Sequence, residues 1–320
     1  MTPATLSVDA GQTGIKLRLS EDIHVLQMTM PGVRTHNPPA EQIAEAVLRA
    51  AGQWARPIHT VAAGVSGLVD DAREGQELLV RLEPAGVRRV VIAHDSVTSY
   101  LGALGANPGA VVAAGTGVVT LAVGARSVAR VDGWGNLLGD AGSGYWIGRA
   151  GLEAAMRAYD GRAAPTRLLQ MLTNQWPDPE AAYIDLQGDA DRVRVVASFA
   201  RQVGELAAVD ATAAAICRAA AQELSMAVEA GLRRVQGGPE AWAEGPEVAA
   251  IGGVFDAEAI RRPFERLLQA SWPKATISVP RGTGIDGAQA LPSLAADHPL
   301  RSRVAECAVP AFTTGVDPVL

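Results

Sequence analysis

Two short segments of the sequence combine glycines with residues that can bind phosphate. The first, Asp9-Ala-Gly-Gln-Thr-Gly-Ile-Lys16, lies on a predicted strand, turn and strand, and the second, Gly115-Thr116-Gly117, lies between two further predicted strands. Glycines let backbone N–H groups close on anionic oxygens, and a carboxylate at a strand end can hold Mg²⁺ directly or through water. Each turn alone is equally typical of a plain hairpin. Two such turns at equivalent places in successive halves of the chain predict a pair of phosphate loops. The candidate ligands are Gly11, Gln12, Thr13, Lys16, Gly115, Thr116 and Gly117 for the phosphates, and Asp9 for the metal.

Asp95 is a candidate for proton transfer. It follows a predicted buried strand, Arg88–Ala93, and precedes a predicted helix, and ligands of α/β folds bind beyond the carboxyl ends of such strands. A carboxylate there can accept the proton of a hydroxyl during phosphoryl transfer. The alternative is that Asp95 caps the helix that begins at Ser96, which is the more ordinary role for aspartate at this position. One residue can do both.

The segment from Gly133 to Gly148 is rich in glycine and also carries two tryptophans and Asp140. So many glycines are costly in backbone entropy for a simple connection, which indicates a loop that holds a polar ligand close to the backbone. Asp140 is the group that can accept sugar hydroxyls, and the tryptophans can supply apolar walls. The alternative is a tight loop that packs around its own aromatic side chains.

Two weaker glycine motifs follow later in the chain. Gly252-Gly253 ends a predicted buried strand ahead of a helix, which suits an adenine ring laid against bare backbone but is equally typical of a helix start. Asp286-Gly287-Ala288 indicates a hinge or a helix-packing glycine.

Composition excludes several classes of protein. The 320 residues are 48% hydrophobic and 19% charged with a formal charge of −6, and no basic stripe indicates nucleic-acid binding. We expect a cytoplasmic protein, because no segment has the length of a membrane span or the pattern of a secretion signal. Cys217 and Cys307 lie far apart and form no CxxC pair, and the histidines show no metal-ligand spacing, so neither a disulfide framework nor a zinc site is expected.

The pattern of predicted elements repeats. Strands at 5–10, 14–20 and 22–28, joined by a glycine turn, are matched by strands at 110–114, 118–124 and 126–131. The segment after residue 144 is mostly helical, with long alanine-rich helices predicted at 193–209 and 211–236. We therefore predict an α/β fold of two domains, 1–105 and a larger 106–320 with helical insertions, in which the tail after residue 299 packs back on the first domain.

In their order along the chain, these motifs resemble the BadF/BadG/BcrA/BcrD ATPase family, and within it the N-acetylglucosamine kinases. The resemblance runs from Asp9 to about Ala288, and its most specific part is Gly133-Trp-Gly-Asn-Leu-Leu-Gly-Asp-Ala-Gly-Ser-Gly-Tyr-Trp-Ile-Gly148. It implies the actin/hexokinase/heat-shock chaperone fold, which consists of two ribonuclease-H-like domains with ATP and Mg²⁺ in the cleft. It implies an enzyme that phosphorylates an amino sugar, most simply N-acetylglucosamine at its 6-hydroxyl, and that works as a homodimer.

The resemblance also implies roles residue by residue. Asp95 matches the catalytic aspartate, Asp140 an aspartate that binds sugar hydroxyls, and Gly252 with Gly253 the adenosine motif. Ser66 and Asn37 (or His36) fall near positions that touch sugar or nucleotide. Asp95 and Gly115 count as sugar contacts as well.

The chain departs from the family's pattern at three places. Val118-Val119 stands where sugar kinases often have Ser-Asn or Ser-Ile, which removes a polar contact to the sugar and leaves glucosamine or another hexose derivative as an alternative acceptor. Gln12 replaces a common glycine, and Ala141 stands where an acid is usual.

Two alternative functions would each require a feature that can be looked for in the sequence. An ATPase that activates a radical dehydratase would need a cysteine near the second phosphate loop to hold an iron–sulfur cluster, and neither cysteine has that context. A sugar-sensing repressor would carry an added helix-turn-helix, and we expect none because the chain opens directly on its phosphate strand.

Overall fold

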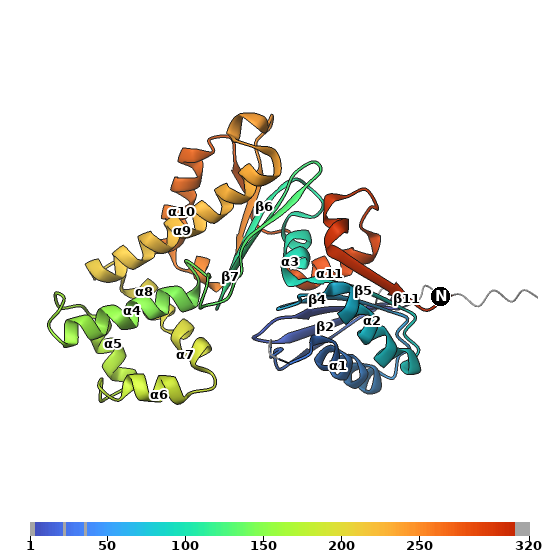
Figure 1. The fold of residues 1–320 in the computed structure, drawn as a ribbon, viewed down its shortest axis with the longest axis horizontal. Coiled ribbons are helices and arrows are strands. Elements are labelled where there is room, and N and C mark those ends of the chain that lie inside the picture. Colours follow the sequence, from blue (N-terminus) through green and yellow to red (C-terminus); the bar gives the residue numbers. More distant parts are fainter. Residues whose placement is uncertain (1–3, 22–23, 35–36, 311–320) are drawn as a thin grey trace, which may run out of the picture. The chain divides into compact units, whose positions relative to one another are not determined.

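The computed structural model describes residues 4–21, 24–34 and 37–310 and divides the chain into two compact units. The first unit comprises Met1–Gly102 and Gly282–Leu320, and the second comprises Ala103–Arg281 (Figure 1). The chain therefore leaves the first unit once and returns to it. This division differs from the predicted ranges 1–105 and 106–320, because the segment after residue 282 packs on strands of the first unit.

The first unit is built on a six-stranded sheet in the order β11-β5-β4-β1-β2-β3. Strands β1, β4 and β5 are parallel, while β2, β3 and β11 run antiparallel to their neighbours. The strands are β1 Thr5–Ala10, β2 Ile15–Glu21, β3 His24–Met30, β4 Thr60–Val65, β5 Arg89–His94 and β11 Val304–Ala308. The last strand had no clear signal in the sequence, and it exists because its backbone pairs with β5.

Because side chains alternate along each strand, the two faces of this sheet contact different helices. Leu6, Val8 and Ala10 share one core with α1 (Pro39–Trp54) and α2 (Asp71–Leu82). Asp9 and Gly64 point to the other face because successive side chains alternate. There they meet α11 (Gly284–Ala290) and α3 (Asp95–Leu104). A β-carbon on Gly287 would overlap the Thr98 carbonyl, so Gly287 is a helix-packing glycine.

The second unit repeats this strand plan in a five-stranded sheet of order β10-β9-β6-β7-β8. As in the first unit, an antiparallel meander is followed by two strands that continue the sheet in parallel. The strands are β6 Gly109–Ala114, β7 Val118–Val123, β8 Val128–Asp132, β9 Glu247–Ile251 and β10 Thr276–Ile277. The repeated meander agrees with the repeat in the sequence pattern.

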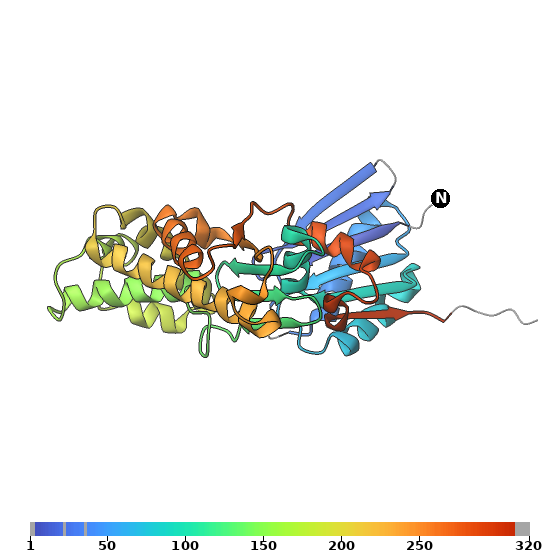
Figure 2. The same cartoon turned by 90° about the horizontal axis from the view of Figure 1, so that it is seen from above.

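Helices make up the rest of the second unit. They are α4 Gly144–Tyr159, α5 Leu168–Gln175, α6 Ala182–Gly188, α7 Arg192–Ser198, α8 Ala200–Leu206, α9 Ala211–Gln236 and α10 Glu258–Ser271. The predicted helix 193–209 is divided at Phe199 into α7 and α8. Helix α9 begins where the Asp210 carboxylate accepts the N–H groups of Thr212 and Ala213, and it packs along α4, α8 and α10 (Figure 2). No helix in the ranges described above is long and apolar enough to cross a membrane.

Short 3₁₀ helices complete the fold: η1 Glu83–Ala85, η2 Pro239–Ala241, η3 Gly253–Asp256, η4 Leu291–Ser293 and η5 Pro299–Arg303.

Candidate active site

In the first unit, the sheet register places Asp9 between residues of the two neighbouring strands, β2 and β4. Asp9 on β1 pairs with Lys16 on β2 and with Gly64 on β4. Its carboxylate lies against the α-carbon of Gly284, where an added β-carbon would come within 2.8 Å of Oδ1. The bare backbone at Gly284 thus leaves the Asp9 side chain room that any other residue would fill.

Several charges gather around Asp9. Burial raises the pKa of this carboxyl group, the Lys16 ammonium lowers it, and the negative charges of Asp95 and Asp286 raise it again. In the part of the chain that the structure describes, no three histidine, cysteine or acidic side chains are grouped so that they could enclose a metal ion. A carboxylate that is not part of an enclosing set of ligands fits Mg²⁺, which keeps most of its waters and takes few protein ligands.

Asp95 is the first residue of α3, at the carboxyl end of β5. Its side chain is 27% exposed, and Oδ1 lies 2.9 Å from Nδ1 of His94. The same Nδ1 lies 3.2 Å from the Ser96 N–H. The predicted capping role of Asp95 is therefore corrected: His94 is the capping side chain, and no helix N–H of the described chain is bonded to the Asp95 carboxylate. Asp95 is left available for chemistry.

The first glycine turn is tight and its side chains are exposed. Gly11 N–H donates to the Gly14 carbonyl at 3.0 Å, and the Gly11 carbonyl accepts the Val33 N–H at 3.0 Å. The exposed candidates on this turn and the following strand are Gln12, Thr13 and Lys16. The Ser66 N–H donates to the Ala10 carbonyl at 2.9 Å, so Ser66 sits beside the end of β1.

Asn37 is not connected to this group by any contact that we observe. It is exposed ahead of α1, and its hydrogen bonds are to Arg34 and Gln42. Its role with sugar or nucleotide stays a prediction. His36 lies outside the described residues.

An ion pair that sequence reasoning missed stands next to Asp9. Arg18 on β2 contacts Oδ1 of Asp286 at 2.5 Å. The other oxygen of Asp286 accepts the N–H and hydroxyl of Thr283, which forms the cap of α11. Burial opposes ionisation, but these hydrogen bonds from Arg18 and Thr283 outweigh it and lower the pKa of Asp286 to about 2. The pair ties α11, and with it Gly284, to β2, which is the strand beside the one that carries Asp9.

In the second unit, the glycine turn between β6 and β7 is held by the start of α4. Gly115 N–H donates to the Gly117 carbonyl at 2.9 Å, and the carbonyls of Gly115 and Thr116 accept the N–H groups of Gly144 and Tyr145 at 2.8 and 3.0 Å. Gly252 has a φ of 96° and approaches Ala114 so closely that a β-carbon would overlap its carbonyl. The turn, the helix start and the Gly252 corner therefore form one assembly.

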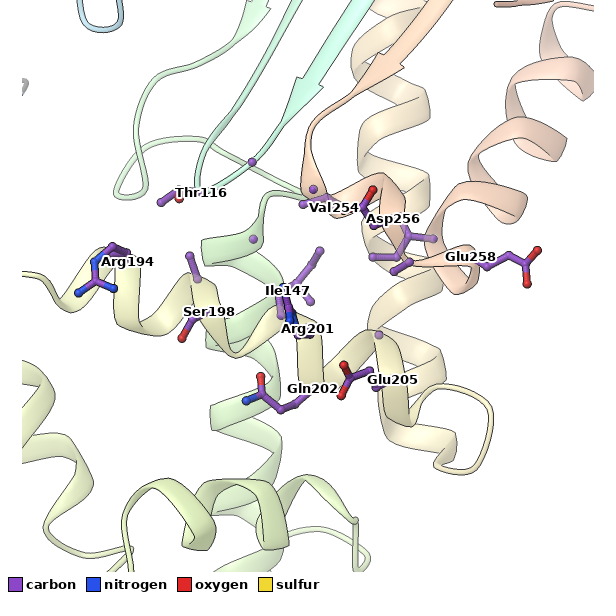
Figure 3. A pocket seen from close by; sticks show the side chains of 18 residues that line it. Thr116, Ile147, Arg194, Ser198, Arg201, Gln202, Glu205, Val254, Asp256 and Glu258 are labelled. Atoms are coloured by element: carbon purple, nitrogen blue, oxygen red, sulfur yellow. The ribbon is translucent and has the colours of Figure 1, made fainter. Parts of the chain in front are cut away.

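A pocket of about 880 Å³ opens beside this assembly. Figure 3 shows Thr116 at one end of the view, Ile147 in the middle, and Gln202 with Glu205 toward the other end. Its apolar wall includes Ile147, Val254 and Ile260. Of the lining residues, the sequence predicts Gly115, Thr116 and Gly253 as site residues. Pockets of this volume, mostly apolar with a few polar groups, suit small molecules and cofactors.

Further lining residues come from the start of α4, from α7 and α8, and from the stretch from η3 into α10. They are Gly144, Arg194, Ala197, Ser198, Ala200, Arg201, Gly204, Asp256, Ala257 and Glu258.

Asp140 lies at the edge of the same turn. It is 7% exposed, has a left-handed φ of 61°, and its Oδ1 accepts the Val118 N–H at 3.2 Å. Its Oδ2 lies beside Gly117, where a β-carbon would come within 2.9 Å, and it accepts no hydrogen bond from any residue in the described ranges. Burial raises the pKa of Asp140, while the Val118 N–H lowers it. One oxygen is therefore free for a ligand hydroxyl. Of the two predicted tryptophan walls, Trp134 is 59% exposed and Trp146 packs partly against the core.

The predicted residues thus gather in two groups, one in each unit. The first unit holds Asp9, Lys16, Ser66 and Asp95 near the carboxyl ends of β1, β4 and β5. The second unit holds Gly115, Thr116, Gly117, Asp140, Gly252 and Gly253 around one turn and one pocket.

Comparisons with known proteins address the fold. A model of the BadF/BadG/BcrA/BcrD ATPase family matches residues 6–290. The chain is 25% identical over 175 residues to the N-acetylmuramic acid/N-acetylglucosamine kinase of Clostridium acetobutylicum. That match covers 51% of this chain and 56% of the relative, so the chain spans only about half the length of the curated protein that it matches.

Solved structures cover nearly the whole chain. A candidate N-acetylglucosamine kinase from Chromobacterium violaceum is similar with a TM-score of 0.70 and 24% identity, over 90% of this chain and 98% of that one. A candidate N-acetylglucosamine kinase from Porphyromonas gingivalis gives 0.66 and 19%, over 90% and 98%. A ROK family glucokinase from Streptomyces griseus, solved with glucose and AMPPNP, gives 0.52 and 18%, over 91% and 100%. These similarities confirm the predicted two-domain, actin-like fold.

Proposed function

Because the chain belongs to the BadF/BadG/BcrA/BcrD ATPase family, as its motifs indicated, we propose that it is a kinase that transfers the γ-phosphoryl group of ATP to an amino sugar. The observation that carries the proposal is the pocket of the second unit, about 880 Å³ in volume and lined by Gly115 and Thr116. A space of this volume can hold a nucleoside, and the glycine turn beside it offers a phosphate site, so the two together supply what a nucleotide requires.

The nucleotide would be divided between these features. The adenosine part fits the pocket between Ile147 and Val254, with bare backbone at Gly253. The glycine turns at 11–14 and 115–117 and the Lys16 ammonium would hold the phosphates. Asp9 would hold Mg²⁺ mostly through water, and a bound Mg²⁺ ion would offset the negative charge of the phosphates.

The chain's own carboxylates would carry the sugar chemistry. Asp140 offers Oδ2 to sugar hydroxyls. The sugar hydroxyl oxygen forms the new bond to the γ-phosphorus, the bond to the β-phosphate oxygen breaks, and ADP leaves. Asp95 orients the hydroxyl and accepts its proton late, because the transition state of phosphoryl transfer is loose.

We propose N-acetylglucosamine as the acceptor, with the 6-hydroxyl phosphorylated. The support is the curated relative, whose name gives N-acetylmuramic acid and N-acetylglucosamine. Val118 is buried against Asp140 and offers the sugar no polar side chain. Glucosamine or another hexose derivative is therefore the alternative to test beside it.

The cysteines argue against an iron–sulfur ATPase activator. Burial raises the pKa of Cys217 to about 11, against a smaller opposing effect of Arg218, and burial raises the pKa of Cys307 as well. Cluster ligands are thiolates, and these two thiols lie in different units. Neither cysteine therefore has the surroundings that a ligand of an iron–sulfur cluster needs.

A coupled assay of ADP release tests the function. The purified protein is given Mg·ATP with N-acetylglucosamine, glucosamine, N-acetylmuramic acid, glucose or no sugar. We expect release that depends on an amino sugar, with N-acetylglucosamine giving the highest kcat/KM, and a 6-phosphate product by mass and NMR spectra. Equal ADP release with and without every sugar would contradict the kinase proposal.

We also propose that the protein is cytoplasmic, since ATP and free sugars meet in the cytoplasm. We propose further that it works as a homodimer. Light scattering on a sizing column is expected to give a molar mass near twice that of one chain. A mass equal to one chain would contradict the dimer and leave the kinase proposal intact.

A further inference from the structure

Asp132 has an unusual number of hydrogen bonds for a residue at the end of a strand. It ends β8, and its Oδ1 accepts the N–H groups of Gly133 at 2.7 Å, Trp134 at 3.4 Å and Asp140 at 2.8 Å. Its Oδ2 accepts the N–H of Ala141 at 3.1 Å. A single carboxylate therefore closes residues 133–139 into a loop and occupies the position that a bound anion would take in a nest of N–H groups.

The local backbone is strained to place this carboxylate. Asp132 has a φ of 58°, which is left-handed and unfavourable for any residue except glycine, with asparagine and aspartate tolerated best. A β-carbon on Gly139 would overlap Oδ1 of Asp132, so the loop closes directly onto the carboxylate. Glycine at position 132 would relieve the strain but would leave four N–H groups without this acceptor.

Arg130 completes the support from the other side. Its Nε donates to the Asp132 carbonyl at 3.2 Å, its terminal nitrogen donates to the Gly133 carbonyl, and the guanidinium lies 4.8 Å above the centre of the Trp134 ring. The carbonyl of Arg130 in turn accepts from Arg234 of α9 at 2.7 Å. The turn at Asp132 is thus fixed to the body of the second unit.

Asp140 is the residue that this support serves. Its backbone N–H donates to the Asp132 carboxylate, its carbonyl accepts the Ser143 N–H at 3.0 Å, and its Oδ1 accepts the Val118 N–H. Oδ2 of Asp140 accepts no hydrogen bond from the described residues and is available to a ligand. Asp140 is itself left-handed at φ 61°, so its backbone would relax if the Asp132 contact were lost, and Oδ2 would move.

We propose that Asp132 is a positioning residue for sugar binding, which holds Asp140 in its left-handed conformation so that Oδ2 faces the sugar hydroxyls. The inference rests on the proposed kinase function and adds to it a residue that does not itself touch the sugar. Removing the Asp132 carboxylate should therefore weaken sugar binding more than nucleotide binding.

The test compares Asp132→Gly with Asp132→Asn in the full-length protein. Glycine accepts the left-handed φ but removes the acceptor, whereas asparagine tolerates that φ and keeps one oxygen for the Gly133 and Asp140 N–H groups. We expect Asp132→Gly to raise the KM for N-acetylglucosamine about ten-fold or more, the scale of a hydrogen bond within a charged pair, and Asp132→Asn to restore it to within about three-fold of wild type. The KM for ATP should change less than about two-fold in both.

Asp160→Gly is the matched control, because Asp160 is an exposed carboxylate of the same unit whose hydrogen bonds, among the described residues, come from Arg162 two positions along the chain. It should leave both KM values unchanged. The positioning role is overturned if Asp132→Gly keeps the wild-type sugar KM, or if its sugar and ATP KM values rise together with a fall in Tm, which is the result of a merely structural role. A wild-type protein that shows no sugar-dependent ADP release would overturn the proposed function, and this inference with it.

Discussion

The carboxylate of Asp9 lies directly against Gly284, although 275 positions separate the two residues in the chain. A β-carbon added at Gly284 would meet Oδ1, Cγ and Oδ2 of Asp9 at 2.8, 2.9 and 3.0 Å. These are the far atoms of a flexible side chain, so an added methyl group would move the carboxylate and leave the backbone in place. The glycine therefore serves the position of the functional group more than the stability of the helix.

Gly284→Ala is accordingly expected to fold with a Tm close to wild type and to lose about ten-fold or more in kcat, because displacements of about 1 Å in a catalytic site cost this much or more. Steady-state assays and thermal denaturation measure the two effects. Gly52→Ala is the control: it lies in α1 with nothing within 4 Å of an added β-carbon, and it should raise stability by up to about 1 kcal/mol without changing kcat. Full activity in Gly284→Ala would contradict a role for Asp9 in the reaction.

Asp95→Asn tests the proton acceptor. The variant keeps the shape of the side chain but cannot accept a proton, so kcat should fall by roughly a hundred-fold or more, on the usual scale for general acid–base groups. ATP affinity, measured by calorimetry without sugar, should stay within about two-fold, because the pocket for the base lies in the other unit. A variant that turns over like wild type would remove Asp95 from the mechanism.

Gly253→Val tests the pocket. A β-carbon added at Gly253 would meet nothing closer than Oδ2 of Asp256, at 3.7 Å, so the variant should fold. The new methyl groups would project into space that we assign to adenosine, and we expect the KM for ATP to rise about ten-fold or more while the sugar KM stays near wild type. An unchanged ATP KM in a folded variant would place the nucleotide elsewhere.

Local pattern predicted the two meanders and the turns on which the candidate phosphate residues lie. Alternating apolar residues around a glycine turn specify a hairpin within about twenty residues of chain, and the register of β1 with β2 then places Lys16 opposite Asp9. The motif at 133–148 predicted a ligand loop in the same way, because its unusual glycine content is visible in the sequence itself.

Other features depend on contacts between distant parts of the chain, and these had no local signal. Arg18 meets Asp286 across 268 positions, and β11 is a strand only because β5 offers it a free edge. The choice of capping residue at α3 depends on the direction of the His94 ring. The side chains of the pocket from α7 and α8 appear in the sequence only as an alanine-rich helix.

The last prediction concerns the ion pair of Arg18 and Asp286. Burial disfavours the charged form of Asp286, but hydrogen bonds from Arg18 and Thr283 outweigh this and lower its pKa from 3.8 to about 2. A lowered pKa in the folded state means that the charged carboxylate stabilises the fold above pH 3.8, and that this contribution is lost as pH falls toward 2. Asp286→Asn should therefore lower Tm at pH 7 by roughly 2 °C, since solvent screens a pair whose side chains are 18% and 40% exposed.

The Tm difference between wild type and Asp286→Asn should be constant from about pH 7 to pH 5, and should shrink between pH 3.8 and about 2 as the wild-type carboxylate takes up its proton. Circular dichroism melts at stepped pH measure it, with Asp185→Asn on the exposed side of α6 as a control that should show no difference. Because the pair ties α11 and Gly284 to β2, the neighbour of the strand that carries Asp9, the variant should also lose some kcat at pH 7, where the charge of the pair is complete. A Tm difference that grows as the pH falls would mean that the ionised Asp286 carboxylate destabilises the fold. The ion pair would then not be what holds α11 in place.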